Sequence, residues 1–398
     1  MVWKVEWDGD FVVGGDGARR LTPNFKLREF RFGGAIRVHR ELVSSLQLLR
    51  NRFGRGIGVH GVDADGLGAT FKGKTTDELL AAADALEAHN LFSLAERAGD
   101  DAVHVRIADP GEVREVGLEQ ALESAFEVTS GFETSGDKFQ QVTGNFDGAG
   151  LSFGPAQVNF GTGTLQPLFE KFAAADRAAL AACFTDPDDW EEWQRVMAMP
   201  SRDDQVAWAN GISTGARLAN VMQPWKGYFQ AVGRVPGFRE IMVEHILRKY
   251  GRKLLRAAGL LQSMCPDIRM DHLRCFCSLY DLVVQQGSLD KAADAIRARI
   301  VDDPPVDQFD LVRIAVEERG RRAKSRWRAD CVSRRLGILE GVPTTITESG
   351  NTTQRANINF YMLRDVVIRD ARQLMDTDVS DQLAAASQAL AGGGSLLA

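Results

Sequence analysis

Two carboxylates in the middle of the chain have the residue types and contrasting surroundings that hydrolysis of a glycosidic bond requires. Glu133 ends an apolar, helix-like segment beside Phe132, and Asp147 follows 147 − 133 = 14 residues later in the glycine-rich run "NFDGAGLSFGPAQVNFGTGTL" (145–165). Such hydrolysis uses one carboxyl kept protonated by a desolvated setting and another that stays ionised. These positions suit Glu133 as general acid and Asp147 as general base. A surface glutamate at a helix end and a turn aspartate before glycine is the other interpretation, and composition alone favours it.

The residues around these acids resemble a known enzyme family. "FETS" (132–135) and "DGAGLS" (147–152) are similar to the lysozyme superfamily, and most of all to the chitosanases of glycoside hydrolase family 46. The resemblance implies that Glu133 and Asp147 are catalytic and that Ser152 helps to hold the attacking water. Leu151 and Ser152 stand where the family has an aromatic residue and a threonine. The amide side chains that we expect to bind substrate are Gln157 and Asn159.

A third acidic residue, Asp281, lies in the segment "RCFCSLYDLVVQQGS" (274–288), at the edge of an apolar helical face. A carboxylate in that position requires a cationic partner. The segment also resembles a family helix whose aspartate belongs to a buried network with arginines. The basic segment "RRAKSRWRADCVSRR" (321–335) offers partners. Arg326 and Arg328, which flank Trp327, are the best candidates, and the sequence does not choose between them.

The first 110 residues mix strand-like and helical patterns and carry a second resemblance. "PNFKLREF" (23–30), "TFKGKTTD" (70–77) and "AVHVRI" (102–107) are similar to zinc peptidases of the D-alanyl-D-alanine carboxypeptidase type. The resemblance implies zinc ligands at Thr70, Asp77 and His104. A catalytic zinc needs three protein ligands and a water, and a threonine hydroxyl is a poor ligand. We therefore expect a degenerate, metal-free domain that binds cell wall, in which His104 is an ordinary strand histidine and neither His39 nor His60 substitutes.

The elements that must position these residues divide the chain into an α+β N-terminal domain and a mainly α, lysozyme-like domain. We expect domains at 1–110 and 117–376, a linker at 109–116 and a low-complexity tail at 377–398. The glycine-rich stretch 143–163 is not a regular helix and has room for a short hairpin. Within the second domain, periodicity predicts helices at 117–130, 164–182, 187–198, 203–221, 225–230, 236–259, 268–286, 290–300, 306–338 and 355–376.

Composition excludes several classes of protein. The chain has 398 residues, 44% of them hydrophobic, and a net charge of −6. That charge argues against a general nucleic-acid binder, which is usually basic. No apolar run approaches the ~18 residues that span a bilayer, and the N-terminus lacks the features of a signal peptide. Five scattered cysteines indicate reduced thiols rather than disulfides or a metal site.

The sequence therefore predicts a glycoside hydrolase without a cofactor, cleaving β-1,4 bonds of an amino-sugar polymer. Peptidoglycan is preferred over chitosan because of the N-terminal resemblance. We expect synthesis in the cytoplasm and action at the cell wall after lysis, release by a holin, or delivery in a phage or injection particle. The alternative is a non-catalytic, glycan-binding structural or adaptor component of such a particle, which would not need a desolvated acid at Glu133. Binding of nucleic acid through 319–335 is disfavoured by the net charge.

Overall fold

The computed structural model describes residues 5–22, 24–53, 56–72, 76–87, 92–109, 115–133, 138–155, 157–355, 363 and 365–371. They form two compact units, one made of Met1–Phe132 with Lys249–Ala386 and the other of Glu133–Arg248. Each unit is described by itself. The chain does not separate at 109–116 in this division, so the two expected domains and the tail stay a prediction.

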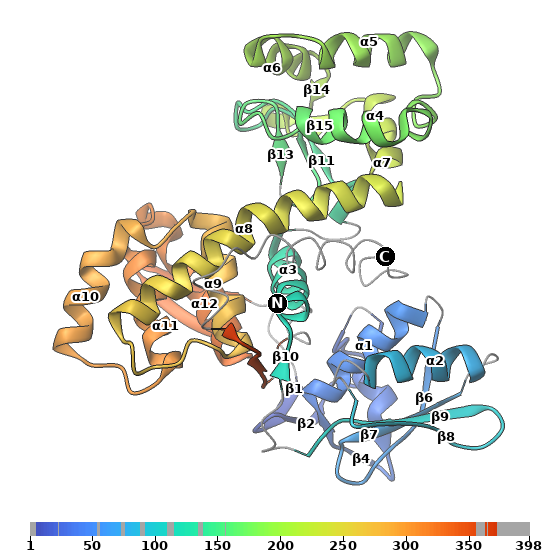
Figure 1. Cartoon of the computed structure of the whole chain (residues 1–398), viewed down its shortest axis with the longest axis vertical. Coiled ribbons are helices and arrows are strands. Elements are labelled where there is room, and N and C mark those ends of the chain that lie inside the picture. The colour runs from blue at the N-terminus through green and yellow to red at the C-terminus, as the bar shows by residue number, and fades with distance from the viewer. Residues whose placement is uncertain are drawn as a thin grey trace. The chain divides into compact units, whose positions relative to one another are not determined.

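The N-terminal part of the first unit is α+β, with two antiparallel sheets of strand order β1-β2-β5 and β6-β7-β9-β8 (Figure 1). In the first helix Leu42, Leu46 and Leu49 recur at helical spacing and are fully buried, which fixes that face against the core. The elements are β1 (Val5–Asp8), β2 (Phe11–Gly15), β3 (Arg31–Phe32), β4 (Ala35–Ile36), β5 (Val38–His39), α1 (Arg40–Phe53), β6 (Gly58–Val62), β7 (Gly68–Lys72), α2 (Thr76–Glu87), β8 (Leu94–Arg97) and β9 (Ala102–Arg106).

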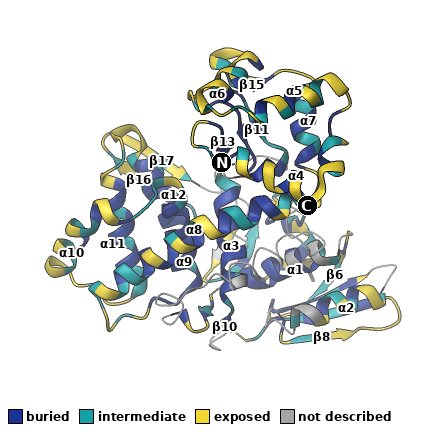
Figure 2. Ribbon diagram, turned by 45° about the horizontal axis from the view of Figure 1, so that its top comes forward, coloured by how far each residue is buried: buried dark blue, intermediate teal, exposed yellow. Residues whose placement is uncertain are grey.

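The remainder of the first unit is mainly helical and is built around one buried helix, α9 (Figure 2). Helix α9 is buried around most of its circumference, as a helix at the centre of a bundle must be. The neighbouring elements are β10 (Glu115–Val116), α3 (Leu118–Glu133), the second half of α8 (Pro236–Met264), α9 (Leu273–Gln286), α10 (Ala293–Asp302), α11 (Gln308–Arg321), α12 (Arg328–Glu340), β16 (Thr344–Glu348), β17 (Asn351–Arg355) and β18 (Val367–Ile368).

The second unit packs helices against a small antiparallel sheet of order β11-β12-β13. Its core is aromatic: the ring centroids of Phe169 and Trp193 lie 4.7 Å apart, and those of Phe153 and Phe238 lie 5.7 Å apart. The elements are β11 (Val142–Thr143), β12 (Ser152–Phe153), β13 (Val158–Asn159), α4 (Gln166–Ala181), α5 (Pro187–Met197), α6 (Arg202–Gly211), β14 (Ser213–Thr214), β15 (Asn220–Val221), α7 (Trp225–Val232) and the first half of α8.

Most expected helices are confirmed, as is the hairpin in the glycine-rich stretch, but three expectations are wrong. The helix expected at 203–221 ends at Gly211, and the hairpin β14–β15 follows. The single helix expected at 306–338 is two helices, α11 and α12. The segment 355–376 contains strand β18, while residues 356–362 and 372–376 lie outside the described residues. Helical periodicity continued through these segments, but turn residues and long-range strand pairing decided the backbone.

A further hairpin lies in a segment for which the sequence predicted no element. Strands β16 and β17 are joined by Ser349 and Gly350, both with positive φ (51° and 78°). Two such residues form the turn that matches the twist of a two-stranded ribbon. Among the described residues, no helix is long and apolar enough to cross a bilayer.

Candidate active site

Asp147 lies in an ordered loop that presents its side chain to solvent. Its Oδ1 accepts a hydrogen bond from the backbone N–H of Ala149 at 3.0 Å. The Asn145 side chain fixes the same loop, accepting from Gly150 N at 2.8 Å and donating to Asn210 at 3.2 Å. Gly148 and Gly150 have φ near +80°, which side chains other than glycine adopt only under strain. The glycines therefore shape a rigid turn, and this explains why a single carboxylate stands among them.

An exposed aromatic ring adjoins Asp147. Phe146 is 51% exposed, although its backbone is held by a hydrogen bond from its N–H to Gly144 O at 2.9 Å. The Phe146 ring and the Asp147 carboxylate are therefore both exposed on the same hydrogen-bonded loop. Sequence reasoning did not single out Phe146, yet its position beside the proposed base was a signal that it could be functional.

The other polar residues of the stretch are largely occupied in building it. Ser152 is 2% exposed in β12 and Asn159 is 9% exposed in β13. The side-chain Oδ1 of Asn159 accepts hydrogen bonds from both N and Oγ1 of Thr162, each at 2.8 Å. Gln157 donates to Gly154 O at 3.1 Å and is half-buried. These contacts give Asn159 a structural task in the loop, and its role in binding substrate stays a prediction, as do those of Ser152 and Gln157.

Glu133 is the last residue of α3. Its side chain lies outside the described part of the structure, so its role as general acid stays a prediction. The helix turn that precedes it is described, and it belongs to a buried polar network.

That network is centred on Asp281, which is fully buried in α9. Its Oδ1 accepts from Arg334 Nε at 2.7 Å, and its Oδ2 lies 3.3 Å from Arg335 Nε. Both arginines are on α12 and are nearly fully buried. The guanidinium of Arg334 also donates to Thr129 O at 3.4 Å and lies 4.4 Å from the ring centroid of Phe132. The same cation therefore joins Asp281 to the last turn of α3.

The structure confirms that Asp281 is buried and paired with arginine, but the two arginines that we expected are wrong. Arg326 is exposed and lies over Trp327, 5.1 Å from its ring centroid. Arg328 donates to Ala323 O at 3.2 Å and to Ser349 Oγ at 3.3 Å. The reason is that α12 begins only at Arg328, so the arginines that face α9 lie almost two turns further along the chain.

In the N-terminal part, the residues at the implied zinc positions make other contacts. Thr70 in β7 is paired in register with His104 in β9. His104 Nε2 lies 3.2 Å from Asp63 Oδ1, and Asp77 forms an ion pair with Arg97. Among the described residues, no group of three His, Cys, Asp or Glu side chains is placed to hold a metal. The residues present do not fit a catalytic zinc, and the predicted absence of zinc awaits measurement.

Neither His39 nor His60, the two histidines considered as substitute ligands, lies in surroundings typical of a zinc ligand. His39 is 5% exposed and packs edge-on against Phe11, with ring centroids 5.0 Å apart. His60 is exposed on β6. Gly73 and Lys74, which belong to the segment 70–77 that resembles the zinc peptidases, lie outside the described residues.

Comparisons with known proteins give no family model and no curated protein that matches the chain. Among solved structures it is similar to a mutant chitosanase from Bacillus subtilis MY002 complexed with 6 GlcN, at 14% identity over 59% of this chain and 98% of that one, with a TM-score of 0.38. It is also similar to the native chitosanase of Bacillus subtilis MY002, at 12% identity over 60% of this chain and 98% of that one, with a TM-score of 0.37. A third similar structure is a Gynuella sunshinyii GH46 chitosanase in complex with chitotetraose, at 12% identity over 61% of this chain and 99% of that one, with a TM-score of 0.38.

Proposed function

We propose that the protein is a glycoside hydrolase that cleaves β-1,4 bonds of an amino-sugar polymer, with Glu133 as general acid and Asp147 as general base. The observation that carries the proposal is the buried network of Asp281, Arg334 and Phe132. It supports a fixed position for the end of α3, because a cation that is buried, ion-paired and packed on a ring has little freedom. A proton donor is effective only when it is held within hydrogen-bond reach of the leaving oxygen.

Asp147 has the opposite surroundings, and these suit a base. An exposed carboxylate keeps contact with water, so Asp147 is placed to take a proton from a water molecule. The Asx-type bond from Ala149 N leaves the second oxygen of Asp147 without a hydrogen-bond partner among the described residues. The unequal settings of helix end and open loop match the division of labour between acid and base in glycosidases.

We infer inversion of configuration at the anomeric carbon, because a carboxylate that activates water opposite the general acid is the arrangement of inverting enzymes. In inverting enzymes the two carboxyls are roughly 6.5–9.5 Å apart. We further propose peptidoglycan rather than chitosan as the substrate. This preference rests on the resemblance of the N-terminal residues to peptidases that act on peptidoglycan stems.

The experiment that tests the activity is an assay of new reducing ends on purified peptidoglycan and on chitosan. The parent protein should cleave at least one of them, and Glu133→Gln should not. Glu191→Gln, which changes an exposed glutamate of α5, is the matched control and should keep full activity. Binding of both polymers without any cleavage by the parent would contradict the proposal and favour a glycan-binding adaptor or structural component of a particle.

A further inference from the structure

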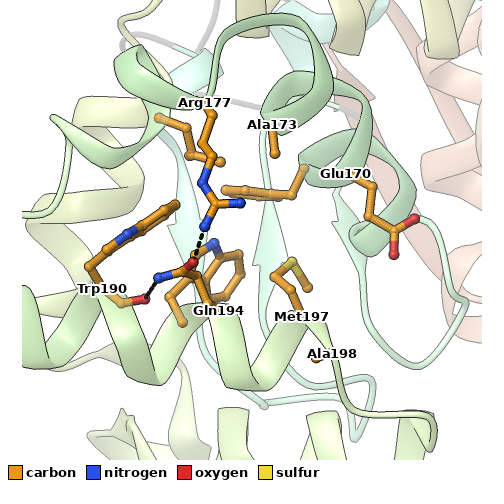
Figure 3. A pocket seen from close by; sticks show the side chains of 10 residues that line it. Glu170, Ala173, Arg177, Trp190, Gln194, Met197 and Ala198 are labelled. Carbon is orange, nitrogen blue, oxygen red and sulfur yellow. Dashed lines mark hydrogen bonds between the residues drawn. The ribbon is translucent and has the colours of Figure 1, made fainter.

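A pocket of about 300 Å³ lies between α4 and α5 in the second unit (Figure 3). Its walls include Phe169, Leu180, Trp193 and Met197, so its inner part is apolar. Phe169 and Trp193 are each 1% exposed and belong to the aromatic core, which makes this wall rigid. The volume is at the lower end of the range for small-molecule sites, which is about 300–1,000 Å³.

The polar groups of the pocket are few, and they are held in place. Figure 3 shows Arg177 pointing toward Gln194, whose Oε1 accepts its hydrogen bond. Gln194 in turn donates to Trp190 O at 3.5 Å, and the Arg177 guanidinium lies 5.9 Å from the Trp190 ring centroid. Within the described chain Arg177 has no carboxylate partner. The carboxylate of Glu170 points away from it and accepts from Gln166 at 2.8 Å.

A second, independent observation concerns the wall of the same pocket. The indole Nε1 of Trp193 is a buried donor that has no hydrogen-bond partner in the described part of the structure. A buried donor left unpaired destabilises the folded protein. A ligand oxygen that came within hydrogen-bond distance of Nε1 would satisfy this donor. The guanidinium of Arg177 and the indole N–H of Trp193 can therefore both donate hydrogen bonds to a ligand, while the rest of the wall favours contact with apolar groups.

We propose that this pocket binds an N-acylated amino sugar, as an accessory glycan site separate from the loop of Asp147. The sugar ring lies along Trp190, the acyl methyl enters the apolar part, and oxygens of the sugar and its acyl group face Arg177 and Trp193. A free amino sugar is disfavoured, because its ammonium would meet the guanidinium of Arg177, which has no carboxylate partner in the described part of the chain. Like charges brought together oppose binding. The choice of a sugar rests on the proposed function, whereas the preference for the acylated form rests on the pocket alone.

The test is a titration of the full-length Glu133→Gln protein with the tetramer of N-acetylglucosamine and, separately, with the tetramer of glucosamine. The readout is the indole N–H resonances of Trp190 and Trp193 among the seven tryptophans, assigned with Trp190→Phe and Trp193→Phe variants. The acetylated tetramer should shift both resonances, and the glucosamine tetramer should bind at least about tenfold more weakly, a difference of 1.4 kcal/mol.

A pair of variants on α4 provides the control. Ala173 lines the pocket, whereas its neighbour Ala174 is exposed and does not line it. Ala173→Phe should fill the pocket and abolish the Trp190 and Trp193 shifts, and Ala174→Phe should preserve them. The inference is overturned if neither resonance shifts, if Ala173→Phe leaves the shifts intact, or if both tetramers bind equally. Failure of the proposed function is distinguishable, because it shows as absence of cleavage by the parent while these shifts persist.

Discussion

Asp147 and Asp281 are both single carboxylates, but their surroundings give them different tasks. Asp147 is exposed on a glycine-shaped turn, and within the described part of the chain its side chain accepts a hydrogen bond from Ala149 N alone. Asp281 has no exposed surface and faces two arginines. A buried, paired carboxylate cannot meet substrate, so Asp281 can influence chemistry only through what it holds. A hydrated carboxylate on a fixed loop can act on water directly.

Replacing Asp147 by asparagine tests its role as base with little effect on the loop. The asparagine Oδ1 can still accept from Ala149 N, so the turn should survive. Activity should fall by about 10²–10⁴-fold, the usual cost of losing one proton-transfer group. Asp176→Asn is the matched control, because Asp176 makes the same kind of bond, to Ala179 N at 2.8 Å. Near-parental turnover of Asp147→Asn would exclude Asp147 as the base.

The stereochemistry of the first-formed product tests the relation between the two acids. If Asp147 activates water opposite Glu133, the product anomer is inverted relative to the substrate. NMR of the reducing end, recorded before mutarotation, reports this directly. A retained anomer would mean that one carboxyl attacks the sugar itself, which requires the two groups to be only about 5 Å apart.

Removal of the Asp281 side chain should destabilise the first unit strongly. Asp281→Ala would leave Arg334 and Arg335 buried without their carboxylate, and breaking a buried pair typically costs about 3–5 kcal/mol. Denaturant unfolding of the variant should show this loss together with reduced activity. The control is Asp290→Ala, because Asp290 is exposed and 3.6 Å from Arg256, and such surface pairs contribute about 0–1 kcal/mol. Equal stability of Asp281→Ala and the parent would refute the network.

At the scale of elements, a polar junction ties the start of α9 to the segment just before β18. His272 caps α9, with Nδ1 accepting from Arg274 N at 3.2 Å, so its Nε2 carries the proton that reaches Asp365 Oδ1 at 2.6 Å. Arg274 Nη2 lies 3.3 Å from the same carboxylate oxygen. The His272 hydrogen bond, followed by the charge of Arg274, holds the pKa of Asp365 well below its usual range.

This junction predicts a pH dependence of stability. The folded-state pKa of Asp365 is lowered, so its contribution is present above the unfolded value of about 3.9 and is lost as the pH falls toward the folded value. Asp365→Asn should therefore lower the Tm at pH 7, and the difference from the parent should shrink below about pH 4. Because Asp365 is 49% exposed, the effect should be modest. Asp370→Asn, an exposed neighbour, should leave the Tm unchanged, and an identical Tm for Asp365→Asn at pH 7 would contradict the assignment.

At the scale of the whole molecule, we predict that the N-terminal part binds no catalytic zinc and adds no peptidase activity to the protein. Metal analysis of the purified full-length protein should give far less than one zinc per chain, and added zinc should not raise the Tm, since a ligand that binds the folded state stabilises it. The physical reason is that Thr70 cannot replace an imidazole and that Asp77 and His104 already have partners. Stoichiometric zinc, or cleavage of a stem peptide that is lost in His104→Ala, would overturn this expectation.

In both compact units, local sequence predicts many of the helices and turns but not the contacts between distant segments. The sequence by itself determined most helices of the second expected domain, the mixed α and β character of the first 110 residues, and the non-helical character of the glycine-rich stretch. Each of these follows from periodicity or from the backbone freedom of glycine, which act over a few residues. It also located Asp147 on a turn and Asp281 on an apolar helix face.

Tertiary structure alone decided which groups meet. Asp281 and Arg334 are 53 residues apart, and the choice of Arg334 over Arg326 depended on where α12 begins and which face it turns to α9. The burial of Ser152 and Asn159 arose because β12 is the middle strand of three and β13 pairs with it. The pocket between α4 and α5 likewise exists only once two helices pack. Contacts of this kind are set by the summed packing of distant segments, so no local pattern of residues contains them.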